Sequence, residues 1–460
     1  MKKNTRLVLL AVMLVLMVAM TIMVASAATI DVAKGEDLAA KVAGAAAGDT
    51  INLTGDVELS STLTIDKDLT ITSAGTVKAG AGFKSDVLIE ITGAAHVVVK
   101  GGSYLAPATV FKISGTATAE FGDNIIVQNT AAAASGCYAA VDVSTTSTAD
   151  PAVTLGKGWF TYLGSYDKSE SKPNPPSADA STALLINSTA IINIAGGKLS
   201  YKYNYDVKAS NTSADGSTYG RAITVNAAGA TVNMLDGGLY HGGSNYMIVA
   251  NSGATDFTLN ISGGELYFYR LWSAQANSTL HITGGTVRNN AGQPNNGHWI
   301  AGWKGCSILI EDGDFIAGTG NANAMFNFNN PGKYVISGGT FNYKQSGTDL
   351  PALIRVSDTN ADISITGGTF TMAGTQGRLI EKNNGKLTLD GATFVNNNSN
   401  AVYIGILGTS GAVTIKNCDF SGTSVGNWLD VTCSASEITT AITARMISVT
   451  HSAAMPPCLV

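Results

Sequence analysis

The 460-residue chain contains 52 glycines, 13% charged residues and 7% aromatic residues. It is too apolar to be disordered and too poor in Glu, Lys and Arg to be mainly helical, so a β-rich globular or solenoid protein is predicted. The formal net charge is −5, and loss of the three basic residues of the leader described next lowers it by three to −8, which indicates no basic surface for nucleic acid or anionic lipid.

Residues 1–27 have the pattern of a signal peptide. The positive "MKKNTR" is followed by an apolar stretch of 18 residues, 7–24, and "ASA" at 25–27 supplies the small residues that a signal peptidase needs. Cleavage after Ala27 is expected, with the mature chain secreted, extracellular or at the cell surface. An uncleaved N-terminal anchor is the alternative, because the apolar stretch could just span a bilayer. No later segment is expected to enter a membrane.

Residues 28–58 are expected to form an N-terminal cap. Leu38, Val42 and Ala45 lie at helical spacing before Gly48, and a strand follows. A short amphipathic helix at this place would cover the open end of a stack of strands, which would otherwise expose its core and its unpaired backbone groups.

A six-residue phrase recurs along residues 59–432. Its clearest copies are "ISGGEL" (261–266), "ITGGTV" (282–287), "ISGGTF" (336–341) and "ITGGTF" (365–370). The apolar residue that closes each copy recurs every 21 to 40 residues, at Val77, Tyr104, Ile126, Phe160, Leu199, Leu239, Leu266, Val287, Phe315, Phe341, Phe370, Phe394 and Phe420.

Each repeat contains three short stretches of alternating pattern, such as "ADISI" (361–365), "TFTM" (369–372) and "RLIEK" (378–382). The pattern predicts three β-strands per repeat. So small a unit cannot bury its own apolar face, so about 13 units are expected to stack as a right-handed parallel solenoid, roughly 60 Å long at ~4.8 Å per unit. The glycine pair lies where one strand bends into the next, and Asn417 replaces it in "IKNCDF" (415–420).

The outward side chains of the strand before the glycines are predicted to offer amides and hydroxyls. In successive repeats they are Asn193, Asn233, Asn260, His281, Leu309, Val335, Ser364, Thr388 and Thr414. Stacked Asn side chains can hydrogen-bond one another, which favours a structural role over a sugar-binding row. At the next outward position the two carboxylates, Glu311 and Asp390, are roughly 14 Å apart, beyond the about 5 to 9.5 Å of glycosidase pairs, so this face is not expected to be catalytic.

No catalytic residue, metal site or cofactor is predicted. The one dense acidic group, "EDGD" (311–314), is expected to be a solvated turn, with a calcium site as the alternative. His241, His281 and His298 fall on successive repeats without a Cys or carboxylate at ligand spacing.

Two long insertions, at 161–181 and 200–220, carry a concentration of tyrosines. Both leave after the second strand of adjacent repeats, so they are expected to emerge side by side, and long loops on a rigid scaffold commonly bind ligands. Aromatic rings with polar neighbours suit sugar rings or a protein partner, although they could instead cover the flank of the stack. The predicted ligand-binding residues are Tyr162, Tyr166, Tyr201, Tyr203, Tyr205, Tyr219, Arg221, Tyr240, Tyr267, Arg270 and Trp272.

The cysteines and the C-terminal tail add little to the prediction of fold or function. The five cysteines show no CxxC or Cys/His spacing, so neither a zinc site nor a dense disulfide framework is predicted, and a Cys418–Cys433 bridge stays open. Residues 433–460 are expected to form an irregular tail, because no further Gly-Gly repeat occurs there.

With its cap, its Gly-Gly phrases and its three-stranded repeats, the chain resembles the right-handed parallel β-helix proteins of the pectin-lyase-like superfamily, especially their Gly-Gly-rich secreted and adhesin-like surface members. The resemblance covers about residues 50–430 and is specific for architecture, because this fold carries lyases, hydrolases, adhesins and passive surface proteins. The polygalacturonases of the superfamily carry an Asp-Asp pair, whereas this sequence has none.

The expected function is that of a secreted, non-enzymatic cell-surface or adhesin-like protein that contacts an extracellular glycan or a surface protein. A polysaccharide lyase or glycoside hydrolase acting near Tyr201, Arg221, His241 and Arg270 is the first alternative. A structural cell-coat subunit is the second.

Overall fold

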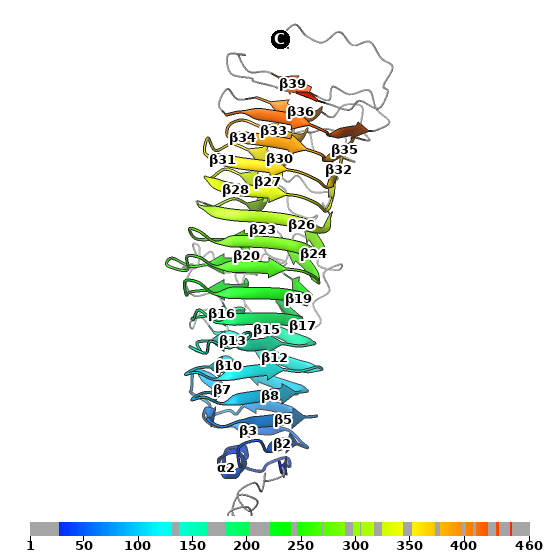
Figure 1. Cartoon of the computed structure of the whole chain (residues 1–460). Coiled ribbons are helices and arrows are strands. Elements are labelled where there is room, and N and C mark those ends of the chain that lie inside the picture. The colour runs from blue at the N-terminus through cyan, green and yellow to red at the C-terminus, as the bar shows by residue number, and fades with distance from the viewer. Residues whose placement is uncertain are drawn as a thin grey trace, which may run out of the picture.

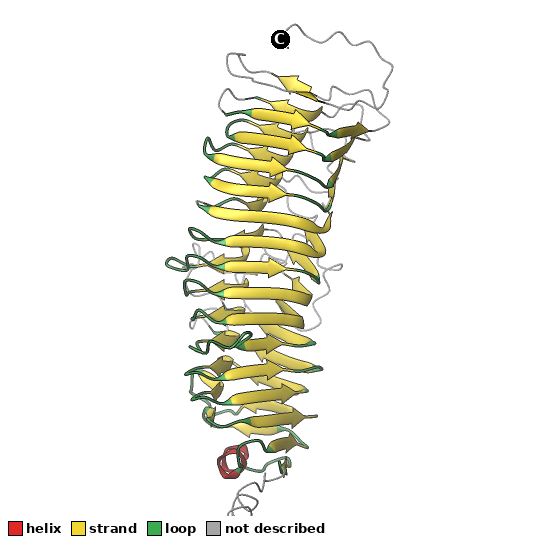
Figure 2. Cartoon of the chain, viewed as in Figure 1, coloured by secondary structure: helices red, strands yellow, loops and turns green. Residues whose placement is uncertain are grey.

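The computed structural model describes residues 27–130, 138–162, 181–201, 221–240, 246–268, 270–289, 298–303, 305–316, 324–343, 352–372, 378–396, 402–407, 411–421, 429–431 and 442–443. Within them the strands stack from the N-terminal helix α2 (Leu38–Gly44) toward the C-terminal strands (Figure 1). The chain runs through three faces of parallel strands in turn, with loops at the corners (Figure 2). The protein is therefore all-β, as predicted, with long parallel sheets consistent with a solenoid.

Face 1 holds the strand that comes before each bend. Each strand pairs in parallel with the equivalent strand of the next repeat. Its members are β1 (Thr29–Val32), β2 (Thr50–Leu53), β5 (Leu69–Ser73), β8 (His96–Lys100), β11 (Thr118–Phe121), β14 (Val153–Leu155), β17 (Ile191–Tyr201), β19 (Thr231–Tyr240), β21 (Thr258–Ile261), β24 (Thr279–Asn289), β26 (Cys306–Ile316), β28 (Gly332–Ile336), β31 (Ala361–Ile365), β34 (Lys386–Asp390), β37 (Val413–Lys416) and β40 (Ile442–Thr443).

Face 2 follows the bend. The long strands β17, β19, β24 and β26 continue through it, so faces 1 and 2 form a single 26-stranded sheet. The separate strands of face 2 are β3 (Val57–Leu59), β6 (Thr76–Ala79), β9 (Gly102–Ala106), β12 (Ile125–Asn129), β15 (Gly158–Tyr162), β22 (Glu265–Phe268), β29 (Thr340–Tyr343), β32 (Thr369–Met372), β35 (Thr393–Asn396) and β38 (Asp419–Ser421).

Face 3 consists of an eight-stranded sheet and a six-stranded sheet. The eight strands are β4 (Leu63–Ile65), β7 (Val87–Ile91), β10 (Thr109–Ile113), β13 (Ala139–Val143), β16 (Thr182–Ile186), β18 (Arg221–Val225), β20 (Tyr246–Ala250) and β23 (Arg270–Ser273). The six are β25 (His298–Ala301), β27 (Ala324–Phe328), β30 (Ala352–Val356), β33 (Arg378–Lys382), β36 (Val402–Ile406) and β39 (Leu429–Val431).

Several strands of face 3 are buried on both sides. Every residue of β13, β16, β18 and β27 is buried, which explains why segments such as "TALLI" (182–186) are almost continuously apolar instead of alternating. The outer side of face 3 is therefore not a solvent-exposed surface along these strands.

The predicted alignment of the closing apolar residues is confirmed by strand register, with one correction. Phe160 pairs with Leu199 and Phe315 with Phe341, and the rings of Phe341 and Phe370 stack with centroids 4.5 Å apart. Tyr104, however, pairs with Val127 and not with Ile126. The bend at Asn124, whose φ is 60°, lies three residues before the inward-pointing Val127, whereas the bend at Gly264 lies two residues before the inward-pointing Leu266. The additional residue moves the inward position from Ile126 to Val127.

The two glycines of a pair meet different constraints. A Cβ on Gly338 would lie 2.0 Å from the carbonyl oxygen of Glu311 in the preceding coil, so only glycine allows the coils to approach this closely. Its neighbour Gly339 has a φ of 97°, a left-handed conformation that side chains disfavour. Asn417 has a φ of 53°, which confirms the predicted replacement of glycine by asparagine.

The predicted capping helix is present as α2. The Asp37 carboxylate accepts a hydrogen bond from the Ala40 backbone N–H at 3.0 Å and caps its N-terminus. Leu38 and Val42 are buried, and α2 lies at the N-terminal end of the stack (Figure 1). Strand β1, which precedes the helix and pairs with β2, was not anticipated from the sequence.

The structure also bears on the cysteine bridge and on membrane insertion. Cys306 and Cys418 are buried free thiols, so Cys418 does not form the bridge to Cys433 that the sequence left open. Over the described part of the chain, the structure holds no helix with the length and apolar character needed to cross a membrane. Residues 1–26 of the predicted signal peptide lie outside the described residues.

Candidate functional site

The predicted tyrosine surface is only partly within the described residues. Tyr166, Tyr203, Tyr205 and Tyr219 lie outside them, and only the backbone of Tyr201 is described. The structure therefore places the remaining members of the set, which come from strands β15, β18, β19, β22 and β23.

Two of these members lie in the core. The side chains of Tyr162 and Trp272 are 0% and 1% exposed. Tyr162 lies two residues after the inward Phe160 and so points the same way, and Trp272 pairs with the buried Ile248. Their burial excludes them from ligand contact, and this corrects the prediction for both.

The other members are covered to different degrees. Arg221 and Tyr240 are 4% and 8% exposed, and the ring of Tyr240 lies across Gly238. Burial, together with Glu265, raises the pKa of Tyr240 to about 12. Tyr267 and Arg270 are half-exposed, so they are the described members of the set that a ligand could still reach.

Arg270 belongs to a cation–aromatic cluster. Its guanidinium carbon lies 5.3 Å from the ring centroid of Tyr246, which in turn lies 5.8 Å from the ring of Trp303. The indole N–H of Trp303 donates to the backbone oxygen of Trp272 at 3.2 Å. Part of this surface is thus already occupied by contacts between coils.

The predicted asparagine column on face 1 is confirmed. Asn233 donates through Nδ2 to the side-chain oxygen of Asn193 at 2.9 Å, and Asn260 donates in the same way to Asn233 at 2.8 Å. Register continues the column through His281 and Leu309. The amides therefore form a ladder that joins successive coils.

A second asparagine ladder, which the sequence analysis missed, follows the strands of face 3. Asn226 donates to Asn187, and Asn251 donates to Asn226, both at 2.7 Å. The ladder begins at Asp142, which accepts from Asn187 at 2.9 Å and whose carboxyl pKa is raised by burial. The signal was an Asn directly after β16, β18 and β20, concealed by the unequal lengths of the repeats.

Charged side chains also pair along the stack. Lys78 lies 2.9 Å from Glu58, and Arg288 lies 3.2 Å from Glu265. The Asp390 carboxylate accepts from Asn417 and lies 3.0 Å from Lys416, and these contacts hold its pKa below the usual value. A carboxylate held ionised in this way is poorly suited to act as a general acid.

The acidic segment 311–314 distributes its carboxylates among separate partners. Glu311 contacts Nε2 of His281 at 2.8 Å, Asp312 accepts from the Gly313 backbone N–H at 2.8 Å, and Asp314 accepts from the Thr340 hydroxyl. No carboxylate stands at ligand spacing from His281 in the sequence, so the His281–Glu311 pair, which joins adjacent coils, is a correction. Within the described residues, no group of three or more His, Cys, Asp or Glu could hold a metal ion.

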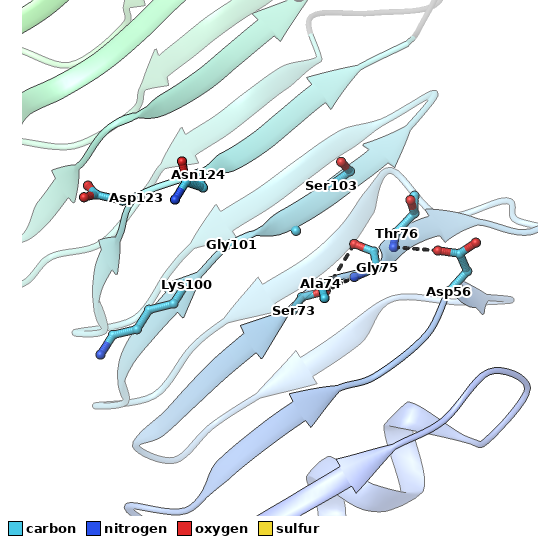
Figure 3. Close-up of a pocket in the computed structure, with 11 residues that line it drawn as sticks. Asp56, Ser73, Ala74, Gly75, Thr76, Lys100, Gly101, Ser103, Asp123 and Asn124 are labelled. Carbon is cyan, nitrogen blue, oxygen red and sulfur yellow. Dashed lines mark hydrogen bonds between the residues drawn. The ribbon is translucent and has the colours of Figure 1, made fainter.

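A surface hollow of about 600 Å³ lies where face 1 bends into face 2 near the N-terminal end of the stack (Figure 3). It was not anticipated from the sequence, where its lining is divided among four repeats. The residues that line it are Asp56, Ser73, Ala74, Gly75, Thr76, Lys100, Gly101, Gly102, Ser103, Asp123 and Asn124.

The hollow is polar and has a backbone floor. In Figure 3, Lys100 and Asp123 lie on one side of Gly101, whereas Thr76 and Asp56 lie on the other. The glycines are required structurally, because a Cβ on Gly101 would lie 2.7 Å from the carbonyl oxygen of Ser73. Close packing of successive coils therefore removes side chains from the floor and leaves room above it.

No family model, no curated protein and no solved structure matches the chain. The geometry of these surfaces and their chemistry therefore carry the argument about function.

Proposed function

We propose that the chain is a secreted, non-enzymatic surface protein with adhesin-like function, which contacts extracellular glycans or surface proteins through outward side chains. Its architecture is proposed to be a right-handed parallel β-helix of about 13 coils, similar to that of the pectin-lyase-like superfamily. Parallel crossover connections are right-handed in almost all proteins, which supports the proposed hand.

The observation that carries the proposal is the uncharged polar column of face 1, in which Asn193, Asn233 and Asn260 hold the coils in register through one bond to each neighbour and keep further hydrogen-bonding capacity for an outside partner. Each amide is oriented by its neighbour in the next coil, so the face presents preorganised donors and acceptors at a repeat of ~4.8 Å. An ordered row of neutral polar groups favours recognition of a hydroxyl-rich or peptide surface. Amide and hydroxyl side chains can donate hydrogen bonds to such a surface and accept them from it, and no proton is transferred in the contact.

The pairing of the carboxylates supports a non-enzymatic role. Glu265 and Asp390 lie beside Arg288 and Lys416, respectively. Acid–base cleavage of a glycosidic bond commonly uses two carboxyl groups about 5 to 9.5 Å apart, one of them with a raised pKa. Asp390 has a lowered pKa, and Asp142, whose pKa is raised by burial, is bonded to Ser144 and Asn187.

The mature protein, residues 28–460, should be screened on a glycan array and incubated with pectins and alginates. Retention of glycans without new reducing ends or unsaturated products is the expected result. Release of such products would replace the proposal with a lyase or hydrolase, and ordered self-assembly without affinity for glycans or surface proteins would replace it with a cell-coat subunit.

The tyrosine insertion is tested in the same screen. The triple variant Tyr201→Ala/Tyr203→Ala/Tyr205→Ala should bind its glycans more weakly than the wild type if this segment contacts them. Equal binding by both proteins would remove the insertion from the ligand-binding surface.

A further inference from the structure

We propose that the corner hollow lined by Asp56, Thr76, Lys100, Ser103 and Asn124 binds one or two units of a neutral, hydroxyl-rich glycan. This inference rests on the proposed function, because it names the place on the surface and the class of glycan. The place differs from the tyrosine surface predicted from the sequence.

The hollow is built from four consecutive corners of the stack. Asp56 follows β2, residues 73–76 lie between β5 and β6, residues 100–103 lie between β8 and β9, and residues 123–124 lie between β11 and β12. The corners approach one another closely, since the Ser103 backbone N–H donates to the Gly75 oxygen at 3.0 Å. The hollow therefore extends along the axis of the stack, so an elongated ligand could lie in it parallel to that axis.

The floor is open because two glycines adopt left-handed conformations. Gly101 and Gly102 have φ values of 71° and 81°, and a Cβ on Gly102 would lie 2.5 Å from the Cβ of Ser73. No side chain can grow from this floor without moving the neighbouring coil, so a ligand can approach the backbone directly.

Some side chains around the floor are already engaged, since Asp56 Oδ1 accepts from the Thr76 backbone N–H at 2.9 Å and the Ser73 hydroxyl contacts the Gly75 backbone, whereas four others are not. Within the described residues, no hydrogen bond or ion pair uses the side chains of Thr76, Lys100, Ser103 or Asn124. Polar side chains next to the hollow are paired instead: the Thr72 hydroxyl donates to the Asn52 side-chain oxygen at 2.9 Å, and Lys78 forms an ion pair with Glu58. The hollow thus gathers uncommitted donors and acceptors from three successive corners.

These groups match the chemistry of sugar hydroxyls, each of which both donates and accepts. The hydroxyls of Thr76 and Ser103 and the amide of Asn124 can do the same, while Lys100 donates and the two carboxylates accept. The lining holds one ammonium, that of Lys100, and two carboxylates, those of Asp56 and Asp123, so its net charge is negative, which disfavours uronates and other polyanions. Its volume of about 600 Å³ lies within the range of about 300 to 1,000 Å³ typical of small-molecule sites.

The separation of the carboxylates argues against a metal ion. Asp56 and Asp123 lie on corners three coils apart, which is roughly 14 Å at the spacing of parallel strands. Calcium needs its oxygen ligands within about 2.6 Å of the ion, so these two carboxylates cannot share one.

The test uses a steric block with a matched control. Ala74 is exposed at the hollow and has no positive φ, so Ala74→Trp should fill the hollow without straining the backbone. Ala81→Trp adds the same side chain at an exposed position that does not line it. Circular dichroism establishes that both variants of the mature protein are folded.

Isothermal titration with neutral cello-, xylo- and manno-oligosaccharides and with oligogalacturonate measures binding. We expect the wild type and the control Ala81→Trp to bind at least one neutral oligosaccharide equally. Ala74→Trp should bind it about tenfold or more weakly, a loss of about 1.4 kcal/mol. Ser103→Ala, which removes one hydroxyl without filling space, should weaken binding by a smaller factor.

Three results would overturn the inference, and they separate it from the proposed function. Equal affinity of Ala74→Trp and wild type would remove the hollow as the site while leaving glycan binding intact. Tighter binding of oligogalacturonate than of every neutral oligosaccharide would refute the class of ligand. Failure of the wild type to bind any glycan on the array would remove the glycan contact from the proposed function as well.

Discussion

The glycine pairs show how a single residue type satisfies two constraints at adjacent positions. The first glycine, such as Gly338 or Gly367, faces a carbonyl oxygen of the preceding coil, 2.0 or 2.2 Å from where a Cβ would lie. The second, such as Gly339 or Gly368, has a positive φ. Other pairs divide the two constraints differently, since Gly101 and Gly102 both have a positive φ and in the pair 237–238 the first glycine has it, but each pair allows a sharp bend close to the preceding coil.

Replacement of the first glycine should therefore cost stability even though alanine is small. We expect Gly338→Ala to lower the free energy of unfolding by about 1 to 3 kcal/mol, because the backbone has to shift to accommodate the methyl group. Gly82→Ala is the control, since a Cβ there meets nothing within 4 Å and Gly82 has no positive φ; its effect should lie within about 0.5 kcal/mol. Urea denaturation measures both, and equal midpoints would contradict the steric explanation.

At the scale of the strand, polar ladders fix the register between coils. The amides on face 1 and those after the strands of face 3 each donate to the equivalent residue of the preceding coil. A slip of one residue would break every bond of a ladder and turn the apolar side chains outward, so the ladders and the apolar pattern specify the same register.

The central amide of the first ladder offers a graded test. Asn233→Ala loses the bonds to Asn193 and Asn260 and should destabilise the protein by about 1 to 3 kcal/mol, at about 0.5 to 1.5 kcal/mol per bond. Asn233→Asp keeps an acceptor for Asn260 but at neutral pH sets a carboxylate oxygen against the Asn193 side-chain oxygen, so its effect should become smaller at a pH low enough to protonate the carboxyl.

Ser364→Ala is the control, because Ser364 occupies the same outward column and its side chain makes no hydrogen bond within the described residues. Thermal denaturation compares the three variants. If Asn233→Ala unfolded at the same temperature as Ser364→Ala, the ladder would contribute nothing to stability.

At the scale of the whole molecule, stability depends on contacts between neighbouring coils, so the end of the stack has to be covered. Helix α2 places Leu38 and Val42 against the first coil, and β1 pairs with β2 on the same end. Without this cover, the first coil would expose its core and a row of unpaired backbone groups that can pair with another molecule.

Charging the buried side of the helix should therefore promote association. The double variant Leu38→Lys/Val42→Lys is expected to detach α2 and to form larger species in sedimentation velocity, increasingly so as protein concentration rises. Ala39→Lys changes the exposed side of the same helix and should behave as the wild type. An unchanged sedimentation coefficient for the double variant, with the protein still folded, would show that α2 does not protect the end.

Much of this architecture could be predicted because the information is local and repeated. The outward column from Asn193 to Thr414 pairs as the alternating pattern indicated, and the capping helix follows from the spacing of Leu38 and Val42. The predicted alignment was wrong at Ile126, because the bend before it contains one residue more than expected. An additional residue at a bend reverses the side to which the following residues point.

The candidate sites were far less predictable. The sequence placed Tyr162 and Trp272 on a binding surface because they lie near other aromatic residues, whereas the strand direction turns both into the core. The hollow joins Asp56 to Asn124 across four repeats, and no local pattern distinguishes its polar residues from those of any other turn.

Local sequence patterns were enough to predict the parallel stacking of short strands, the columns that alternate between core and surface, and the bends, apart from the extra residue after Asn124. Period-2 alternation and recurring glycine pairs act within a few residues and repeat in every coil, so they can be recognised without knowing what lies next to them. The folded arrangement of the coils was needed to show which outward groups find partners, such as His281 with Glu311, and which stay uncommitted around the hollow. Those outcomes depend on contacts between residues some twenty to thirty positions apart, whose alignment a shift of one residue at a bend is enough to change.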